Sequence, residues 1–265
     1  MQQTLLPRAA ALAWLGTAAF TLAGCELAVG SRSAEARADW SRDYAVTGEA
    51  RFELVNTNGR ISVEPSGDAQ VHVRAEKIVK AATEETAKQM LAEIEIAEGV
   101  EPSRIRLETR RPTRGVFGGG SVEVRYTVQV PSSVTVEVDN TNGGVQLRDL
   151  QNAVDAETTN GGIGGEGLRG SLRAQTTNGG ISLDVASLGA EGLDLSTTNG
   201  GVSVKLPADA KADISVRCTN GGINVGDLKV DATESSRRRL EGRLNGGGPK
   251  IKAETTNGGI TLAAR

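Results

Sequence analysis

The residue best suited to acid–base or nucleophilic chemistry is His72, the only histidine of the 265-residue chain. Val71 and Val73 flank it, and this alternation is typical of a strand residue that points to solvent. No Ser-His-Asp set, Cys-His pair or group with metal-ligand spacing can be assembled from the sequence. We therefore predict a protein that is not an enzyme and that uses no cofactor and no metal ion.

Carboxylates are the next candidates, because a pair of them can hydrolyse a glycosidic bond. Solenoid-shaped polysaccharide lyases and hydrolases carry carboxylates and basic residues along one face. The repeating motif of this chain offers threonine and asparagine there, and no acid pair. A polysaccharide-acting enzyme is therefore the least favoured interpretation, although several acidic residues are available: Asp139, Asp149, Asp155, Asp184 and Asp194.

Cys25 is placed for a different chemistry, acylation of its thiol. Arg8 precedes an apolar run of 15 residues (9–23), which fits a secretory signal and is too short for a membrane-spanning helix. The run closes on Leu-Ala-Gly-Cys, which resembles a bacterial lipobox. This resemblance implies that residues 1–24 are a lipoprotein signal peptide and that Cys25 carries a diacylglyceryl group at the mature N-terminus.

The residues after Cys25 are small and polar, so we predict a flexible tether over residues 25–42 and a folded domain over 43–265. The protein would be an exported, membrane-anchored lipoprotein, either periplasmic or at the cell surface. Glu26 stands where an aspartate resembles an inner-membrane retention signal in some bacteria, which favours the outer membrane. Acylation of Cys25 would leave Cys218 without a disulfide partner.

The net charge of the chain indicates which classes of binding partner to expect. The chain has 30 basic and 33 acidic residues, and Arg8 is the only charge of the predicted signal. The mature chain therefore has 30 − 1 = 29 basic residues against 33 acidic ones, a net charge of −4. This mild acidity gives no general reason to bind nucleic acid. We expect the membrane, through the lipid, and an envelope protein or surface partner, and the sequence leaves the oligomeric state open.

Thr-Thr-Asn-Gly-Gly, or a close variant, occurs seven times in the chain. From Asn142 to Asn220 the copies are 18, 18, 21 and 21 residues apart. Such a short period is typical of stacked repeats that cannot bury their apolar faces alone. We predict a structural turn at each copy: Asn58 and Gly59, Asn142 and Gly143, Asn160 and Gly161, Asn178 and Gly179, Asn199 and Gly200, Asn220 and Gly221, Asn257 and Gly258.

Apolar and polar residues alternate on both sides of each turn. Before Asn178, Leu172 and Ala174 alternate with polar residues, and Ile181 and Leu183 resume the pattern after it. This alternation indicates half-buried strands. The predicted fold class is therefore all-β, a β-solenoid- or β-helix-like stack of short repeats. Cys218, which replaces the threonine or asparagine of other copies, is interpreted as a small buried filler.

The Asn-Gly pair suits a corner with positive φ. Because every turn is the same, we expect the asparagine side chains to stack and to bridge successive corners. Two arrangements remain open. The repeated 18-residue step favours parallel rungs, whereas the Asn-Gly pair itself favours consecutive hairpins.

The period breaks twice. Residues 83–92 have apolar side chains at helical spacing behind Thr83 as N-cap, so the N-terminal part, to about residue 131, contains one short helix. Regular repeats follow over 132–265. The charged segment 231–249 puts Arg239, Glu241 and Arg243 at inward positions, and we interpret it as an insertion or widened hairpin. The last rung would then end the stack and need cover.

The repeated Thr-Thr-Asn-Gly-Gly-Ile, the Val130-Pro131 step before it and the preceding helix resemble the bacterial "putative adhesin" family, a domain of unknown function. The resemblance covers about Phe52 to Leu262. It implies a β-solenoid-like stack in exported or membrane-attached proteins, with no established enzymatic activity. Some relatives look associated with envelope-stress regulators.

Two functions follow as hypotheses. The first is a non-catalytic, lipid-anchored cell-envelope protein that uses its β-stack for adhesion or scaffolding. The second is an envelope-stress accessory protein that binds a membrane partner.

Overall fold

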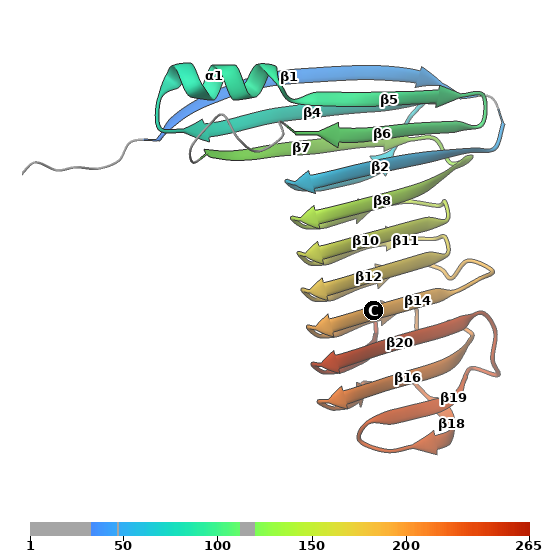
Figure 1. Cartoon of the computed structure of the whole chain (residues 1–265). Helices are drawn as coiled ribbons and strands as arrows, with labels where there is room; N and C mark the ends of the chain where they lie inside the picture. Colours follow the sequence, from blue (N-terminus) through green and yellow to red (C-terminus); the bar gives the residue numbers. More distant parts are fainter. Residues whose placement is uncertain (1–32, 47, 112–119) are drawn as a thin grey trace, which may run out of the picture. The chain divides into compact units, whose positions relative to one another are not determined.

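Each repeat forms one rung of two strands, because the apolar side chains on both sides of its turn point into the same interior. For the repeat around Asn178, these strands are β12 (Leu172–Asn178) and β13 (Ile181–Val185). The computed structural model describes residues 33–46, 48–111 and 120–265, and there the rungs stack into two long sheets (Figure 1). The predicted all-β class with a short helix in the N-terminal part is confirmed.

One sheet has ten strands and contains the second strand of every rung. Its order is β1 (Ala34–Ala45), β4 (Gln70–Ala81), β7 (Gly120–Val130), β3 (Ile61–Pro65), β9 (Val145–Arg148), β11 (Ile163–Leu168), β13, β15 (Val202–Leu206), β21 (Ile260–Ala264) and β17 (Ile223–Val225).

The other sheet has eleven strands and contains the first strand of every rung. Its order is β18 (Val230–Ser235), β19 (Arg239–Leu244), β16 (Ala212–Asn220), β20 (Lys250–Asn257), β14 (Leu193–Asn199), β12, β10 (Val154–Asn160), β8 (Val134–Asn142), β2 (Ala50–Asn58), β6 (Arg104–Arg110) and β5 (Glu95–Glu101).

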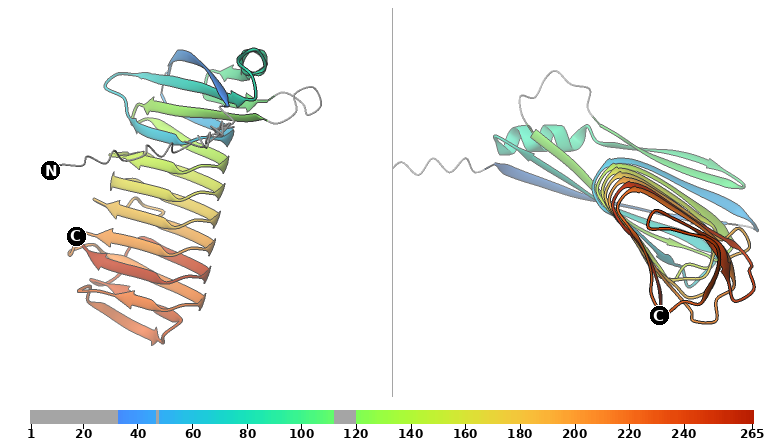
Figure 2. Two further views of the ribbon diagram at one scale, coloured as in Figure 1. Left: turned by 90° about the vertical axis from the view of Figure 1, so that its left-hand side faces the viewer. Right: turned by 90° about the horizontal axis from the view of Figure 1, so that it is seen from below.

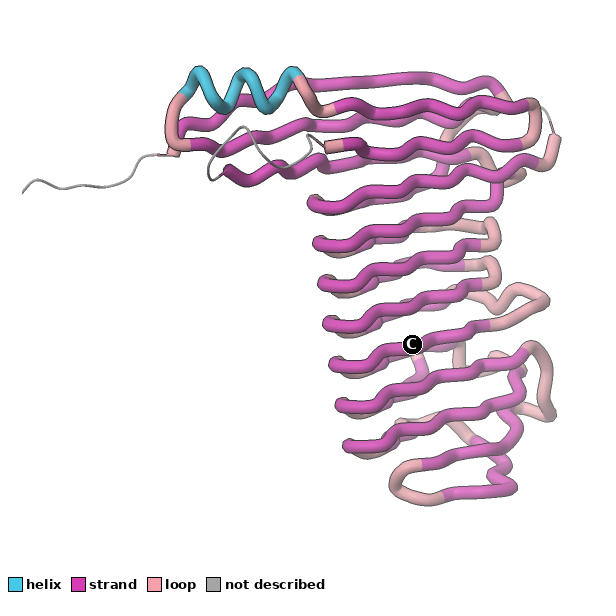
Figure 3. Tube along the Cα trace, viewed as in Figure 1, coloured by secondary structure: helices cyan, strands magenta, loops and turns pink. Residues whose placement is uncertain are grey.

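Neighbouring rungs pair in parallel and in register. Asn160 lies opposite Asn178 in one sheet, and Ile163 lies opposite Ile181 in the other. The stack therefore consists of parallel rungs and not of consecutive hairpins, and the rungs superimpose in the view from below (Figure 2, right). The connections between rungs lie on the side opposite the Asn-Gly turns (Figure 3).

The inward side chains of both sheets form one continuous core. In the rung of β12 and β13, Leu172, Ala174, Ile181 and Leu183 are at most 4% exposed. The same buried cluster extends from Ala36 to Leu262. Each rung thus completes its burial against its neighbours, as expected for repeats too small to be stable alone.

The first part of the domain, which we call the head, contains β1, β4, β5, β6, β7 and α1 (Glu84–Ala92). Strands β1, β4 and β7 pair antiparallel, and β7 then pairs in parallel with β3 of the first rung. Helix α1 begins after Thr83, whose Oγ1 accepts a hydrogen bond from Thr86 N, as predicted for its N-cap. Within the described ranges, no helix has the length and apolar character needed to cross a bilayer.

The predicted tether over 25–42 is wrong for its second half, because residues 34–42 belong to β1. This strand pairs with β4 along its whole length, from Ala34 opposite Ala81 to Ala45 opposite Gln70. Its exposed face is charged, and only Ala36 and Tyr44 are buried, so its composition resembles that of a linker. The predicted signal peptide and Cys25 lie outside the described residues.

The rung formed by the end of the chain does not end the stack, contrary to the prediction. Strands β20 and β21 lie between the rung of β14 and β15 and the rung of β16 and β17. Sequence order and stacking order therefore differ for the last two rungs. All repeats present the same backbone edge, so nothing local in the sequence selects one neighbour over another.

The charged segment before the last rung forms the antiparallel pair β18 and β19, which covers β16. Arg239, Glu241 and Arg243 do not occupy inward positions, because the register with β16 sets Leu240 opposite the buried Val216 and Leu244 opposite the buried Ala212. Leu240 and Leu244 are buried instead. This pair and the rung of β16 and β17 together form what we call the terminal unit (residues 212–244).

Candidate functional site

The seven turn asparagines form one hydrogen-bonded ladder along an edge of the stack. Each Nδ2 donates to the Oδ1 of the asparagine in the preceding rung at 2.7–2.9 Å. At the head the first asparagine donates to the carbonyl oxygen of Val122 at 3.0 Å. All seven amides therefore point the same way, in the order Asn58, Asn142, Asn160, Asn178, Asn199, Asn257 and Asn220.

Replacing Asn160 by aspartate is expected to break this ladder at neutral pH. The carboxylate would still accept from Asn178 but could not donate to Asn142 Oδ1, which lies 2.8 Å from the present donor. We expect the free energy of unfolding to fall by about 1 kcal/mol, measured by denaturant titration at pH 7. Part of the loss should be recovered in acid, where a protonated carboxyl donates again.

Thr159→Asp is the control. Thr159 is exposed, and this substitution adds the same charge beside the ladder without changing any of its asparagines. It should change the free energy of unfolding by less than about 0.5 kcal/mol. If both variants lose equal stability at pH 7, charge and not the ladder is responsible.

A second, buried column lies two residues before the asparagines. Thr158 donates its hydroxyl to the carbonyl oxygen of Gly143 in the neighbouring rung at 3.0 Å, and Thr176 does the same to Gly161 at 2.8 Å. Cys218 takes this position near the end of the stack, where it is 3% exposed and its Sγ lies 3.9 Å from Arg237 O. Its role as a small buried filler agrees with this place.

Between these columns, every rung carries a threonine on the outer face of the eleven-stranded sheet. Neighbouring outward positions vary in charge from rung to rung, as Asp155, Arg173 and Asp194 show. We call the edge of the stack that carries the Asn-Gly turns the turn edge. It presents one threonine hydroxyl and one asparagine amide per rung, at the spacing of neighbouring strands in a sheet. The threonines are exposed except for the first, which is half-buried: Thr57, Thr141, Thr159, Thr177, Thr198, Thr256 and Thr219.

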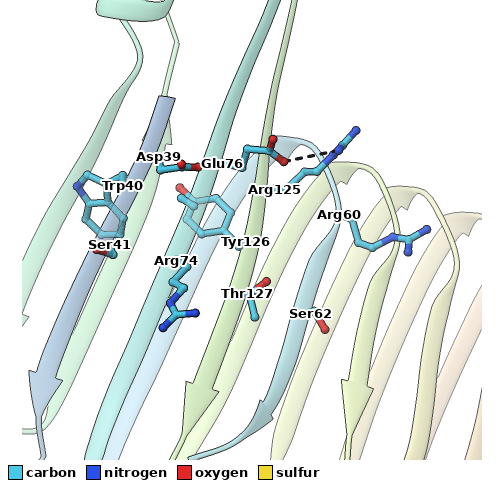
Figure 4. Close-up of a pocket in the computed structure, with 11 residues that line it drawn as sticks. Asp39, Trp40, Ser41, Arg60, Ser62, Arg74, Glu76, Arg125, Tyr126 and Thr127 are labelled. Carbon is cyan, nitrogen blue, oxygen red and sulfur yellow. Dashed lines mark ion pairs between the residues drawn. The ribbon is translucent and has the colours of Figure 1, made fainter. Parts of the chain in front are cut away.

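A shallow groove of about 490 Å³ lies on the outer face of the head (Figure 4). Strands β1, β4, β7 and β3 meet there, and their pairing aligns Ser41, Arg74, Thr127 and Ser62 in one row across the sheet. The row joins three hydroxyls to one guanidinium, a set that donates hydrogen bonds to oxygen atoms of a ligand.

The groove is bordered by charges that are only partly paired. Arg125 contacts Glu123 at 2.6 Å and Glu76 at 3.7 Å, and its pKa is raised, first by the Glu123 hydrogen bond. Arg74 and Arg60 have no carboxylate within 4 Å among the described residues. The groove therefore has guanidinium groups available for an anionic or polyhydroxylated ligand, but no nucleophile with a base beside it.

His72 lies outside this groove, and both of its ring nitrogens contact nearby carboxylates. Its Nδ1 lies 2.6 Å from Asp43 Oδ1, and its Nε2 lies 3.0 Å from Asp68 Oδ1. The imidazole thus joins β1 to the turn before β4. Hydrogen bonds to Asp43 and then Asp68 raise the pKa of His72 above 6.5. This arrangement agrees with the prediction of a strand residue that points away from the core.

The His72 contacts predict a pH dependence of stability. The pKa of His72 is raised in the folded state. The stabilisation from its contacts with Asp43 and Asp68 is therefore fully present below the unfolded pKa of about 6.5, and it is lost as the pH rises through the folded pKa. We expect an NMR titration of the single imidazole to give a midpoint above 6.5. Asp43→Asn should lower that midpoint, and an unchanged midpoint would contradict the assigned contact.

The carboxylate candidates are divided between the two sheets. Asp155 and Asp194 lie on either side of Arg173, which contacts Asp155 at 3.6 Å, and burial raises the pKa of Asp155. Asp184 is on the opposite sheet and contacts Arg265 at 2.8 Å. Within 33–46, 48–111 and 120–265, no three metal-ligating side chains gather at one point.

Other perturbed groups in the head have structural explanations. Glu53 accepts two hydrogen bonds from Arg104 and one from Arg106, which lower its pKa and fasten β6 to β2. Tyr126 is buried against Thr109, and burial raises its pKa to about 12.

Sequence analysis identified the turn residues but missed the groove. The ladder was foreseeable because the same residue recurs at one place in each repeat. The groove takes its residues from four strands between Asp39 and Thr127, and most of one of them, β1, was assigned to the tether. Charge alternation along that segment was the one available signal of a strand.

Parallel rungs, a shared apolar interior and a ladder of identical turns define the protein as a β-solenoid-like repeat protein. The model of the Toastrack DUF4097 family matches residues 119–263, which is more than half of the chain. The protein therefore belongs to the Toastrack DUF4097 family, and the predicted family resemblance is confirmed.

Several solved structures align with most of the chain at low identity. A "putative cell adhesion protein" from Clostridium sporogenes ATCC 15579 is 12% identical, covering 87% of this chain and 100% of its own, with a TM-score of 0.41. A "putative adhesin" from Bacteroides fragilis NCTC 9343 is 14% identical, covering 86% and 97%, with a TM-score of 0.40. A "putative lipid binding protein" from Parabacteroides distasonis ATCC 8503 is 9% identical, covering 84% and 96%, with a TM-score of 0.33. No curated protein matches this chain.

Proposed function

We propose that this protein is a non-catalytic binding module of the cell envelope, anchored through a lipid on Cys25, that serves adhesion or scaffolding. The observation that carries the proposal is the continuous stack of seven in-register rungs, which makes a preformed and rigid surface. A ligand that binds such a surface does not have to order it, so little binding energy is lost to ordering.

The surface chemistry supports binding over catalysis. The turn edge presents repeated hydroxyl and amide groups, and the head groove presents Arg74 among hydroxyls. These groups donate and accept hydrogen bonds but are poor acids and bases at neutral pH. A partner would therefore be bound through polar contacts along an extended face.

The anchoring part is tested in the native host with Cys25→Ala. The wild-type chain should fractionate with membranes and incorporate labelled palmitate, and the variant should do neither. Surface protease accessibility of the wild-type chain then distinguishes the cell surface from the periplasm. A variant that stays in the membrane fraction would contradict the lipid anchor.

The binding part is tested by cell–cell aggregation and attachment. A deletion strain should aggregate less than the parent, and wild-type protein should restore aggregation, whereas Cys25→Ala should not. Arg74→Glu should weaken the effect while Arg173→Glu, on the opposite sheet, should not. Turnover of any glycan by the purified chain, lost on replacing Asp155 and Asp194, would overturn the non-catalytic assignment.

A further inference from the structure

A second hollow adjoins the head groove, and two arginines line both of them. This second hollow, which we call the edge hollow, has a volume of about 690 Å³ and lies where β7 of the head meets the turn edge. Its lining includes Asn58 and Asn142, the first two members of the asparagine ladder. Arg60 and Arg125 line it together with the head groove, so the two hollows meet at these arginines.

The two shared arginines are neighbours of like charge. The parallel pairing of β3 with β7 places Arg60 beside Arg125, and both side chains are exposed. The carboxylates that line the head groove, Glu76 and Asp39, lie in the row of Arg125, which also contacts Glu123. Arg60 has no carboxylate within 4 Å among the described residues. Like charges on neighbouring strands repel, and a bound anion would relieve this repulsion.

The head groove carries the positive charge further, along a floor of hydroxyl groups. Arg74 is exposed and, in the part of the chain that the structure describes, lies within 4 Å of no carboxylate. Thr127 and Ser62 lie between Arg74 and Arg60 (Figure 4), in agreement with the strand order β4, β7 and β3. Guanidinium groups therefore stand at both ends of the hydroxyl floor.

This arrangement fits a sugar polymer with acidic groups. Guanidinium groups bind carboxylate or phosphate oxygens through paired hydrogen bonds, and hydroxyl and amide groups exchange hydrogen bonds with sugar hydroxyls. Hollows of about 490 and 690 Å³ exceed many times the roughly 30 Å³ of a water molecule, so a single small anion would leave them mostly unfilled. A protein partner is less well matched, because interfaces depend on apolar anchors. Among the described residues, the exposed large apolar side chain is Val100, in β5 of the eleven-stranded sheet.

We infer that the head groove and the edge hollow together bind one acidic polysaccharide. This inference rests on the proposed binding function and names the class of its ligand. The polymer crosses β1, β4, β7 and β3 and continues to the turn edge. Its acidic groups contact Arg74 at one end of the floor and Arg60 and Arg125 at the other. Its hydroxyl groups contact Thr127 and Ser62.

The first test measures the binding of polygalacturonate, which has a carboxylate on every sugar, to the full-length chain in neutral detergent by isothermal titration calorimetry. Arg74→Gln and Arg60→Gln should each raise the dissociation constant at least about tenfold, because each removes charge-assisted hydrogen bonds. Arg238→Gln is the matched control. Arg238 is exposed and, within the described ranges, also lacks a carboxylate within 4 Å, but it lies in the terminal unit. This control should leave the dissociation constant unchanged.

The second test separates a shaped site from general attraction between charges. Thr127→Val removes a hydroxyl but no charge, and it should raise the dissociation constant about fivefold. Thr135→Val is its control, because Thr135 is exposed on β8 of the other sheet. Neutral dextran should not bind to the wild-type chain.

Three results would overturn the inference: equal losses for Arg74→Gln and Arg238→Gln, no binding of polygalacturonate or dextran sulfate, or displacement of the polymer by phosphatidylglycerol added to the micelles. The last result would assign the arginines to lipid headgroups. The aggregation and attachment assays are independent of these measurements. Polymer binding by a chain whose deletion leaves aggregation and attachment unchanged would contradict the adhesion role and leave the polysaccharide site standing.

Discussion

Replacing Gly179 by alanine is expected to lower the free energy of unfolding by roughly 3 kcal/mol. An added Cβ at this position would lie 2.0 Å from the carbonyl oxygen of Gly161 in the neighbouring rung. The contact is with backbone, so no side-chain rotation can relieve it. The two rungs would have to separate, which strains the Asn178–Asn160 hydrogen bond of 2.9 Å and the parallel pairing around it.

Gly222→Ala is the control for this prediction. Gly222 is the second glycine of another turn, and its added Cβ would meet only the side chain of Arg237, at 3.9 Å. Stability should stay within about 0.5 kcal/mol of wild type. Urea titrations of both variants give the comparison, and equal losses would show that the close stacking of rungs is not the reason for glycine at Gly179.

The glycine turns show where sequence reasoning gave the right residue for an incomplete reason. Positive φ was the expected reason for glycine, and it holds at Gly59 and Gly143, with φ of 129° and 135°. At Gly161 and Gly179 the requirement is instead the carbonyl oxygen of the neighbouring rung, 2.2 and 2.0 Å from an added Cβ. That contact depends on stacking, which local sequence does not contain. The turn asparagines themselves have negative φ, and their ladder explains their identity.

Local sequence patterns predicted the individual strands well, but they predicted the stacking order of the rungs less well. The alternation around each turn is set by burial, so β12 and β13 could be placed from the residues. The insertion of β20 and β21 is a choice among equivalent backbone edges. Pairs such as Lys252 with Asp194 form only where these strands lie side by side, so the sequence alone does not reveal them.

The head was predicted least well, because its strands meet residues far away in the chain. Ser41 and Thr127 become neighbours of Arg74 through antiparallel pairing, and Ser62 joins them through a parallel one. A groove built in this way has no signature at any single position. The turn edge, by contrast, repeats the same chemistry in every rung and was visible in the sequence.

Replacing Val216 by aspartate is expected to lower the free energy of unfolding by roughly 4 kcal/mol, because it buries an unpaired carboxylate. Val216 is 1% exposed and lies between Ala253 of β20 and Leu240 of β19. The substitution should therefore detach the terminal unit before the rest of the stack unfolds. Hydrogen exchange should show faster exchange in β16 and β19 than in β10 and β12.

Ser215→Asp tests the same strand from its other face. Ser215 is half-buried and lies opposite Lys252 and Glu241, so a carboxylate there keeps access to water and to one cation. We expect a change below about 0.5 kcal/mol. Substitutions at two residues adjacent in sequence should then have very different effects on stability, because a one-residue step along a strand exchanges the interior for solvent. Equal melting temperatures for the two variants would contradict the inward and outward assignment on which the stack depends.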